Sequence, residues 1–181
     1  MSSARLVLVG AVAAALVAMS ACSPPDRGEL ERKTTTRATV ASFTAAPGGV
    51  STVIERRCGS LDCHGDPARN LRVYSARGLR LPNDAGLVPG SGDTTRDEMI
   101  ATYESLLTLE PEQTNKVLDG VEDASTLLIV KKPLEIEKHK GGPVMKRNDD
   151  AERCIVSWLR ESPTSPVDKD ACTRAAVFPK E

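Results

Sequence analysis

The chain has 181 residues, with 24 basic and 25 acidic side chains, a formal net charge of −1 and 40% hydrophobic residues. This length fits one domain with an additional segment and is too short for two large cores. The balanced charge offers no basis for binding a nucleic-acid backbone, and the ordinary apolar content argues against a disordered chain. Only 3% of the residues are aromatic, so we expect something other than aromatic side chains, such as a cofactor, to fill part of the core.

The first 21 residues are typical of an export signal and take no part in the predicted fold. Arg5 supplies the positive charge, and the apolar run from Leu6 to Met19 is shorter than the roughly 20 residues of a membrane span. The small residues before Cys22 resemble a bacterial lipobox. This implies a lipoprotein anchored through acyl chains on Cys22, and Ser23 favours the outer membrane, facing the periplasm or the cell surface. The alternative is an ordinary secretory signal that leaves Cys22 as a free thiol.

Residues 22–49 are rich in Ser, Thr, Pro and Gly and show no apolar period, so they predict a flexible tether. Residues 50–181 then form the single predicted domain. Apolar spacing over Val50 to Cys58 predicts its first helix, with Thr52 opening a capping box. Loops and an irregular or briefly extended segment are predicted over 59–92.

Asp93 is the predicted cap of a second helix, whose apolar stripe runs from Met99 to Leu107. A short helix is predicted over 111–118. The apolar run over 124–130 is of ambiguous type, because periodicity alone does not separate a short strand from a helical turn.

A last helix begins at Asp149, which forms a predicted cap with Glu152, and ends before Ser162 and Pro163. Its apolar face consists of Ala151, Ile155, Trp158 and Leu159. The pattern as a whole predicts a mainly α domain with long loops and a helix near each end.

Two cysteines stand before a histidine in the segment Cys58-Gly-Ser-Leu-Asp-Cys63-His64. This is the arrangement of c-type haem attachment, in which two thiols add to the haem vinyl groups and the adjacent imidazole reaches the iron. Four residues separate the cysteines here, whereas two are usual. We therefore expect the two extra residues to bulge out of the loop.

The helix before this Cys/Cys-His-Gly loop and the Trp-bearing helix near the end resemble a class I cytochrome c domain. The series Ala124-Ser-Thr-Leu-Leu-Ile-Val-Lys-Lys-Pro-Leu134, His139-Lys-Gly-Gly142 and Ile155-Val-Ser-Trp-Leu159 resembles cytochrome c-like domains of exported bacterial proteins. The resemblance covers residues 50–161. It implies a cytochrome c-like helical fold in which the terminal helices cross and one haem c lies in the pocket between them, with His64 as its proximal iron ligand.

The resemblance also implies a distal iron ligand in the loop that precedes the last helix, where His139 and Met145 lie. His139 is favoured, because it opens the His-x-Gly-Gly series, and Met145 is second. An open or water-bound iron is the third possibility. Met99 lies on the apolar stripe of its helix and is expected in the core.

Cys154 and Cys172 remain once the other cysteines are assigned, and they predict a disulfide in an oxidising compartment. Three alternatives compete with haem at the first pair. In these alternatives the two cysteines, Cys58 and Cys63, form a disulfide, bind zinc together with His64 and His139, or act as a reactive dithiol.

These observations predict a lipid-anchored monohaem c-type cytochrome that carries electrons between redox proteins at the cell envelope. No nucleophile–base pair or acid pair indicates an enzyme. The alternatives are a non-haem structural or binding lipoprotein with a Cys58–Cys63 disulfide, and a haem-containing sensor or accessory subunit of a larger envelope complex. Cations around the distal loop, diluted by Glu135 and Glu137, form a solvated surface or a rim for acidic partners: Lys131, Lys132, Lys138, Lys140, Lys146 and Arg147.

Overall fold

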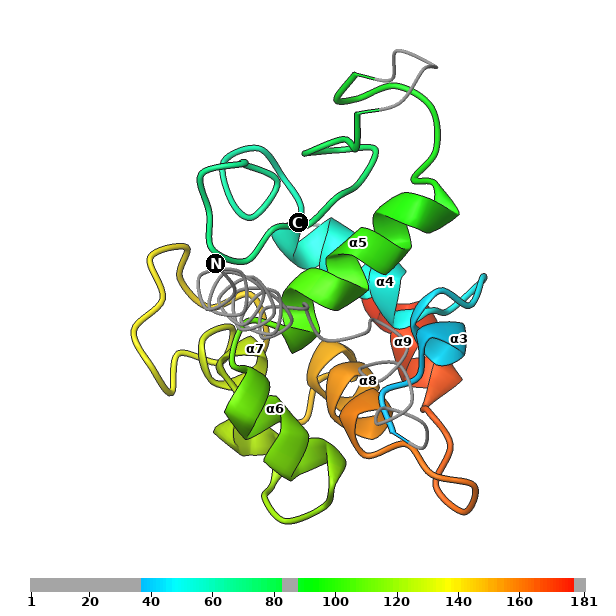
Figure 1. Ribbon diagram of the computed structural model, residues 1–181, viewed down its shortest axis with the longest axis vertical. Helices are drawn as coiled ribbons and strands as arrows, with labels where there is room; N and C mark the ends of the chain where they lie inside the picture. The colour runs from blue at the N-terminus through cyan, green and yellow to red at the C-terminus, as the bar shows by residue number, and fades with distance from the viewer. Residues whose placement is uncertain (1–36, 83–87, 178–181) are drawn as a thin grey trace, which may run out of the picture. The chain divides into compact units, whose positions relative to one another are not determined.

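Helices build most of the regular structure in this computed structural model, which describes residues 37–82 and 88–177 (Figure 1). The described residues form seven α-helices and one 3-10 turn, and their only β-pairing consists of isolated bridges. The prediction of a mainly α protein is confirmed. The expected export signal and Cys22 lie outside the described residues. No helix in the described part of the chain is long and apolar enough to cross a membrane.

The helices follow one another with loops of very different length. The longest connections are the loop between α4 and α5 and the loop between α7 and α8. The elements in chain order are α3 (Val40–Phe43), α4 (Val50–Cys58), α5 (Arg96–Leu107), α6 (Pro111–Leu118), the 3-10 turn η2 (Ala124–Thr126), α7 (Leu128–Lys131), α8 (Asp150–Leu159) and α9 (Lys169–Ala175).

Helix α8 starts as predicted, because the Asp149 side chain accepts the backbone N–H of Glu152 at 2.8 Å. Helix α6 has Pro111 in its first turn, where the missing N–H costs nothing. The ambiguous run over 124–130 is helical, split between η2 and the start of α7. Its short turns are too brief to show a helical period in the sequence.

Two predicted caps are wrong. Helix α5 begins after Thr95, not Asp93, and Thr95 and Glu98 form a complete capping box. Helix α4 begins after Gly49, which offers no side-chain cap, so Thr52 lies inside the helix. Several Ser, Thr and Asp residues stand near each start, and spacing alone does not select among them.

One aromatic cluster forms the centre of the core. The ring centroid of Phe43 lies 5.1 Å from that of Trp158 and 5.6 Å from that of Tyr103, and all three residues are buried. Such tilted and edge-on pairs are favourable beyond the area that they bury. Aromatic side chains therefore fill this part of the core, and the expected cofactor is not required to fill it.

The predicted tether over residues 22–49 is too long, because the chain is packed from residue 37 onward. The Ala38 N–H donates to the Trp158 carbonyl at 3.0 Å, and the Trp158 indole N–H donates to the Thr39 carbonyl at 3.2 Å. The Thr39 N–H and hydroxyl both donate to the carboxylate of Glu161. One buried aromatic side chain and these bonds order a segment whose composition resembles a linker.

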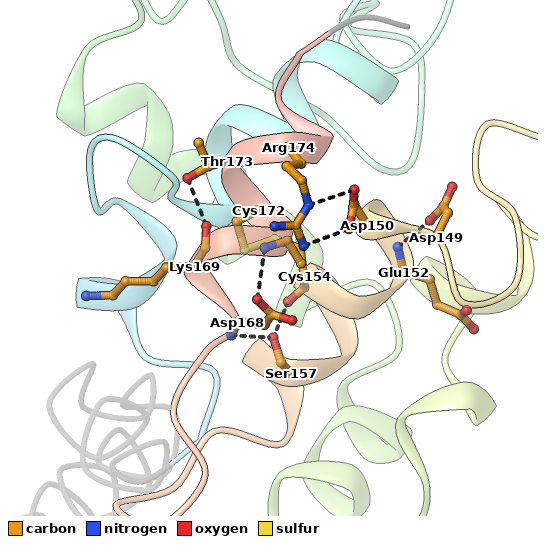
Figure 2. The surroundings of a disulfide bond; sticks show 11 residues. Asp149, Asp150, Glu152, Cys154, Ser157, Asp168, Lys169, Cys172, Thr173 and Arg174 are labelled. Atoms are coloured by element: carbon orange, nitrogen blue, oxygen red, sulfur yellow. Dashed lines mark hydrogen bonds and ion pairs between the residues drawn. A yellow bond between two sulfur atoms is a disulfide. The ribbon is translucent and has the colours of Figure 1, made fainter.

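Helix α9 was not expected, and a disulfide joins it to α8 (Figure 2). Cys154 and Cys172 form the bond, as predicted, across a sequence separation of 18 residues. The Asp168 side chain caps α9 by accepting the Ala171 N–H at 2.9 Å, and the Asp168 N–H donates to the Ser157 hydroxyl of α8 at 3.0 Å. The C-terminal helix is thus held to the core covalently and by hydrogen bonds.

We expect replacement of both Cys154 and Cys172 by alanine to lower the free energy of unfolding by about 3 kcal/mol, the chain-entropy value for a loop of this size. Urea unfolding followed by circular dichroism measures the change. Dithiothreitol should destabilise the wild type by a similar amount and leave the double variant unaffected. Equal stability of the wild type and the double variant would contradict this assignment.

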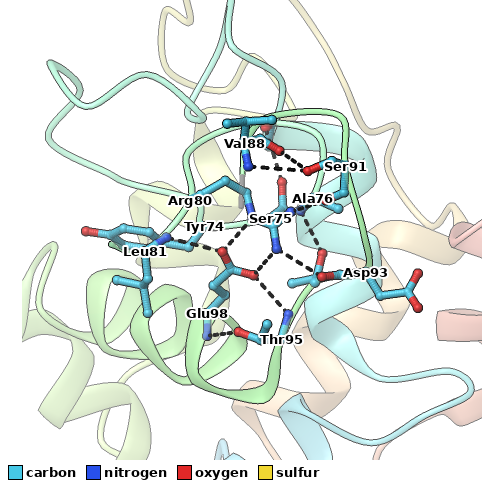
Figure 3. Close-up of polar contacts among 12 residues, drawn as sticks. Tyr74, Ser75, Ala76, Arg80, Leu81, Val88, Ser91, Asp93, Thr95 and Glu98 are labelled. Atoms are coloured by element: carbon cyan, nitrogen blue, oxygen red, sulfur yellow. Dashed lines mark hydrogen bonds and ion pairs between the residues drawn. The ribbon is translucent and has the colours of Figure 1, made fainter. Parts of the chain in front are cut away.

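A buried ion pair holds the loop before α5 (Figure 3). Arg80 and Glu98 are both buried, and the guanidinium donates to the two carboxylate oxygens at 2.7 and 3.0 Å. The guanidinium also donates to the carbonyls of Ser91 and Asp93, and the Leu81 N–H donates to Glu98 at 3.2 Å. The charges compensate each other, and backbone groups satisfy their remaining hydrogen-bonding capacity.

Candidate cofactor-binding site

The loop that follows α4 brings together Cys58, Cys63 and His64, the residues predicted to attach a haem and bind its iron. Cys58 is the last residue of α4, and its carbonyl accepts the N–H of His64 at 2.9 Å. The N–H groups of Cys63 and Gly65 both donate to the Ser60 carbonyl, at 3.0 and 2.9 Å. These bonds fold the segment back on itself, so that one compact turn carries Cys58, Cys63 and His64.

The two extra residues of the Cys-x4-Cys spacing project from this turn, as predicted. Leu61 and Asp62 are exposed, with 51% of Leu61 accessible to solvent. Arg69 holds the outer side of the turn, because its guanidinium donates to the carbonyls of Cys63 and Asp62 at 3.3 and 3.4 Å. The wider spacing is thus accommodated without separating Cys63 from His64.

Three glycines let the cysteine turn pack directly against the chain that follows it. A Cβ atom added to Gly78 would lie 2.0 Å from the Gly59 carbonyl oxygen, and one added to Gly65 would lie 2.8 Å from the Gly78 Cα. No side chain fits in either space. Backbone therefore packs against backbone, which fixes the position of the turn that bears His64.

Cys58 and Cys63 are free thiols, both partly buried. Burial raises the pKa of the Cys58 thiol to about 12; the nearby Cys63 raises it further, whereas Arg57 acts in the opposite direction. Cys58 is therefore protonated at neutral pH. Reactive dithiols depend on a lowered thiol pKa, so this environment does not favour that alternative.

His139 and Met145 lie in the loop between α7 and α8, as predicted, but in different surroundings. His139 is half-buried and opens a turn in which the Gly142 N–H donates to the His139 carbonyl at 3.1 Å. Met145 is buried in the hydrophobic core, and its N–H donates to the Pro133 carbonyl at 3.1 Å. Met99, expected in the core, is only half-buried on α5.

The two histidines of the described chain form a parallel pair. The rings of His64 and His139 are stacked, with centroids 6.1 Å apart and ring planes that differ by 8°. His64 Nδ1 lies 3.1 Å from the Leu71 carbonyl oxygen, and His139 Nδ1 lies 2.8 Å from the Gly142 carbonyl oxygen. A carbonyl only accepts hydrogen bonds, so each Nδ1 carries a proton, and the neutral form of each ring has its lone pair on Nε2.

The environment of His64 favours its neutral form. Burial lowers the pKa of His64, the bond to the Leu71 carbonyl opposes this, and the charges of His139 and Arg69 lower it further. A neutral imidazole with a free Nε2 is the form that binds a metal ion. Hydrogen bonding of the other ring nitrogen to a carbonyl is the usual support for such a ligand.

The zinc alternative has no compact group of ligands in the described part of the chain. Over residues 37–82 and 88–177, no three His, Cys, Asp or Glu side chains are grouped so that they could hold a metal ion. A c-type haem needs no such group, because its two cysteines bond to carbon and only the axial ligands bind iron.

No protein-family model, curated protein or solved structure matches the chain. The resemblance to class I cytochromes c thus stays a prediction. What the site does follows from its own residues.

Several groups that shape the site carry no signal in the sequence. The Leu71 carbonyl is a backbone atom, and Gly78 reads only as a chain breaker. Arg57 donates to the Val144 carbonyl at 3.3 Å and so ties the end of α4 to the loop between α7 and α8. Only the glycine pair after His139 could be recognised in the sequence as part of the site.

The cations near His139 divide into two groups. Lys131 and Lys132 lie 3.6 and 2.8 Å from the carboxylate of Glu137. These contacts partly neutralise the start of the loop. The cations that are exposed to solvent are Lys138, Lys140, Lys146 and Arg147.

Proposed function

We propose that the protein is a c-type cytochrome that binds one haem c and transfers electrons at the cell envelope. Cys58 and Cys63 would hold the haem through thioether bonds, and His64 and His139 would bind its iron. The parallel His64–His139 pair beside the cysteine turn carries this proposal.

The two rings lie close enough together for one ion to be bound by both. A transition-metal ion bound by both rings lies in the plane of each ring, about 2 Å from one nitrogen, so the stacked rings would turn edge-on toward it. The centroids of His64 and His139 are 6.1 Å apart. Both rings also have the Nδ1–carbonyl bond that orients a metal-binding histidine.

When bound, the haem would supply a one-electron redox centre. The residues of this chain would set its properties. Two imidazole ligands give a lower reduction potential than an imidazole with a methionine sulfur. The carbonyls of Leu71 and Gly142 would hold the rings in place and increase their basicity. The burial of Met145 in the core supports the choice of His139 over Met145 as the distal ligand.

We also propose that the protein is a lipoprotein whose partners are redox proteins of the envelope. The lipobox-like sequence before Cys22 supports the anchor. The disulfide between Cys154 and Cys172 supports an oxidising compartment. Two acyl chains or more would give stable attachment to the membrane, which a single chain does not.

Covalent haem is the test of this function. The full chain is produced in a host with a cytochrome c maturation system, and we expect a Soret band and haem staining that survives a denaturing gel. The variant with Cys58→Ser and Cys63→Ser should lose the stain, whereas the matched variant with Cys154→Ser and Cys172→Ser should keep it. A colourless wild-type protein that is nevertheless fully folded would contradict the proposal.

A further inference from the structure

We propose that Gly142 is a positioning residue for His139 and acts through its own backbone carbonyl. This inference deepens the proposed haem site and rests on it. It concerns how one short turn selects the nitrogen that His139 presents to a metal.

Gly142 makes two hydrogen bonds to the same residue. Its N–H donates to the His139 carbonyl at 3.1 Å, and its carbonyl accepts from His139 Nδ1 at 2.8 Å. One backbone hydrogen bond and one side-chain hydrogen bond therefore close the same turn. The His139 ring therefore has a fixed orientation relative to its own turn, with the proton on Nδ1 and Nε2 free.

The backbone conformation of Gly142 makes this pair of bonds possible. Its φ is +72°, in the left-handed region that residues with a side chain disfavour. A Cβ atom at Gly142 would meet no atom within 4 Å, so substitution there adds strain without a steric clash. Gly141 differs, since a Cβ atom there would lie 3.3 Å from His139 Cε1 and would push on the ring directly.

Gly142→Ala should therefore move the carbonyl away from His139 Nδ1 and leave the rest of the loop intact. The ring would lose its orienting partner, and His139 would spend more time away from the iron. This effect differs from loss of the ligand, because the imidazole is still present and only its positioning is weakened.

Cyanide titration of the ferric holoprotein measures this effect. Cyanide occupies the distal position only when His139 is detached, so its apparent affinity follows the fraction of detached protein. We expect Gly142→Ala to tighten cyanide binding about tenfold, the effect of forcing a side chain into the left-handed conformation. Gly90→Ala is the matched control, because Gly90 has a φ of +81° with no atom within 4 Å of a Cβ and lies in the loop before α5.

Measurements in the wild-type and His139→Ala backgrounds separate a positioning role of Gly142 from general destabilisation. In the His139→Ala protein, adding Gly142→Ala should leave cyanide affinity unchanged, because no ligand remains to be positioned. Unchanged cyanide binding in Gly142→Ala alone would overturn the proposal. So would an equal effect of Gly90→Ala, or an effect of Gly142→Ala that persists without His139.

A chain purified without haem would contradict the proposed function and still test this inference. Nitrogen-15 NMR of the histidine side chains then reports the tautomer of His139. We expect the Nδ1–H form in the wild type and in Gly90→Ala, and a mixture of tautomers in Gly142→Ala. The same tautomer in all three proteins would overturn the positioning role of Gly142.

Discussion

Replacing His139 by alanine is expected to abolish the low-spin spectrum of the ferric holoprotein, whereas Met145→Leu leaves that spectrum unchanged. His139 lies parallel to His64 with its Nε2 free. Met145 is 4% exposed and packs in the hydrophobic core, and leucine conserves that packing at a cost of less than about 1.5 kcal/mol. Visible absorption and electron paramagnetic resonance spectra distinguish low-spin from high-spin iron.

The reverse pattern would assign the distal position to Met145. In that case Met145→Leu converts the iron to high spin, and the wild-type protein has the higher reduction potential of a histidine–methionine pair. His64→Ala serves as the reference for complete disruption, because it removes the proximal ligand next to the cysteines. A spectrum that neither distal substitution changes would indicate an open or water-bound iron.

The largest expected loss of stability follows from Glu98→Gln. This substitution leaves the buried Arg80 guanidinium without its counter-charge, and breaking a buried pair in this way costs about 3–5 kcal/mol. Glu98 is fully buried and bonded to Arg80 at 2.7 Å. Glu122→Gln is the matched control, because Glu122 is partly exposed and pairs at 3.5 Å with the exposed side chain of Lys116, and pairs near the surface contribute little. Chemical unfolding at pH 7 measures both variants.

This loss should depend on pH. Burial acts to raise the pKa of Glu98, but the hydrogen bonds from Arg80, Thr95 and Leu81 outweigh it and hold the pKa below the ordinary 4.5. A carboxyl group whose pKa is lowered on folding contributes its full stabilisation above the unfolded-state pKa. The contribution is then lost as the pH falls toward the folded-state pKa. The stability difference between wild type and Glu98→Gln should therefore shrink below pH 4.5, and a constant difference through this range would contradict the ion-pair explanation.

Features that depend on local spacing could be predicted from the sequence. The turn bearing Cys58, Cys63 and His64, the α8 cap at Asp149 and the bulge between the cysteines follow from residues close together in the chain. Local chemistry decides each of these. Helix α9 was missed, because its seven residues are too few to show an apolar face.

Features that depend on packing between distant segments could not be predicted in detail. Nothing in the sequence measures the 6.1 Å between the rings of His64 and His139. Glu98 looks like an ordinary acidic residue in the first turn of a helix until Arg80 is placed against it. Phe43 lies in a segment of linker-like composition, and its burial depends on Tyr103 and Trp158 far along the chain.

The electron paramagnetic resonance spectrum of the ferric wild-type holoprotein tests the haem site most directly. Two imidazoles whose planes are as close to parallel as the 8° between His64 and His139 should give a rhombic low-spin signal. Perpendicular rings give a single signal at large g instead. A high-spin signal, or the absence of any haem signal, would contradict an iron held by His64 and His139.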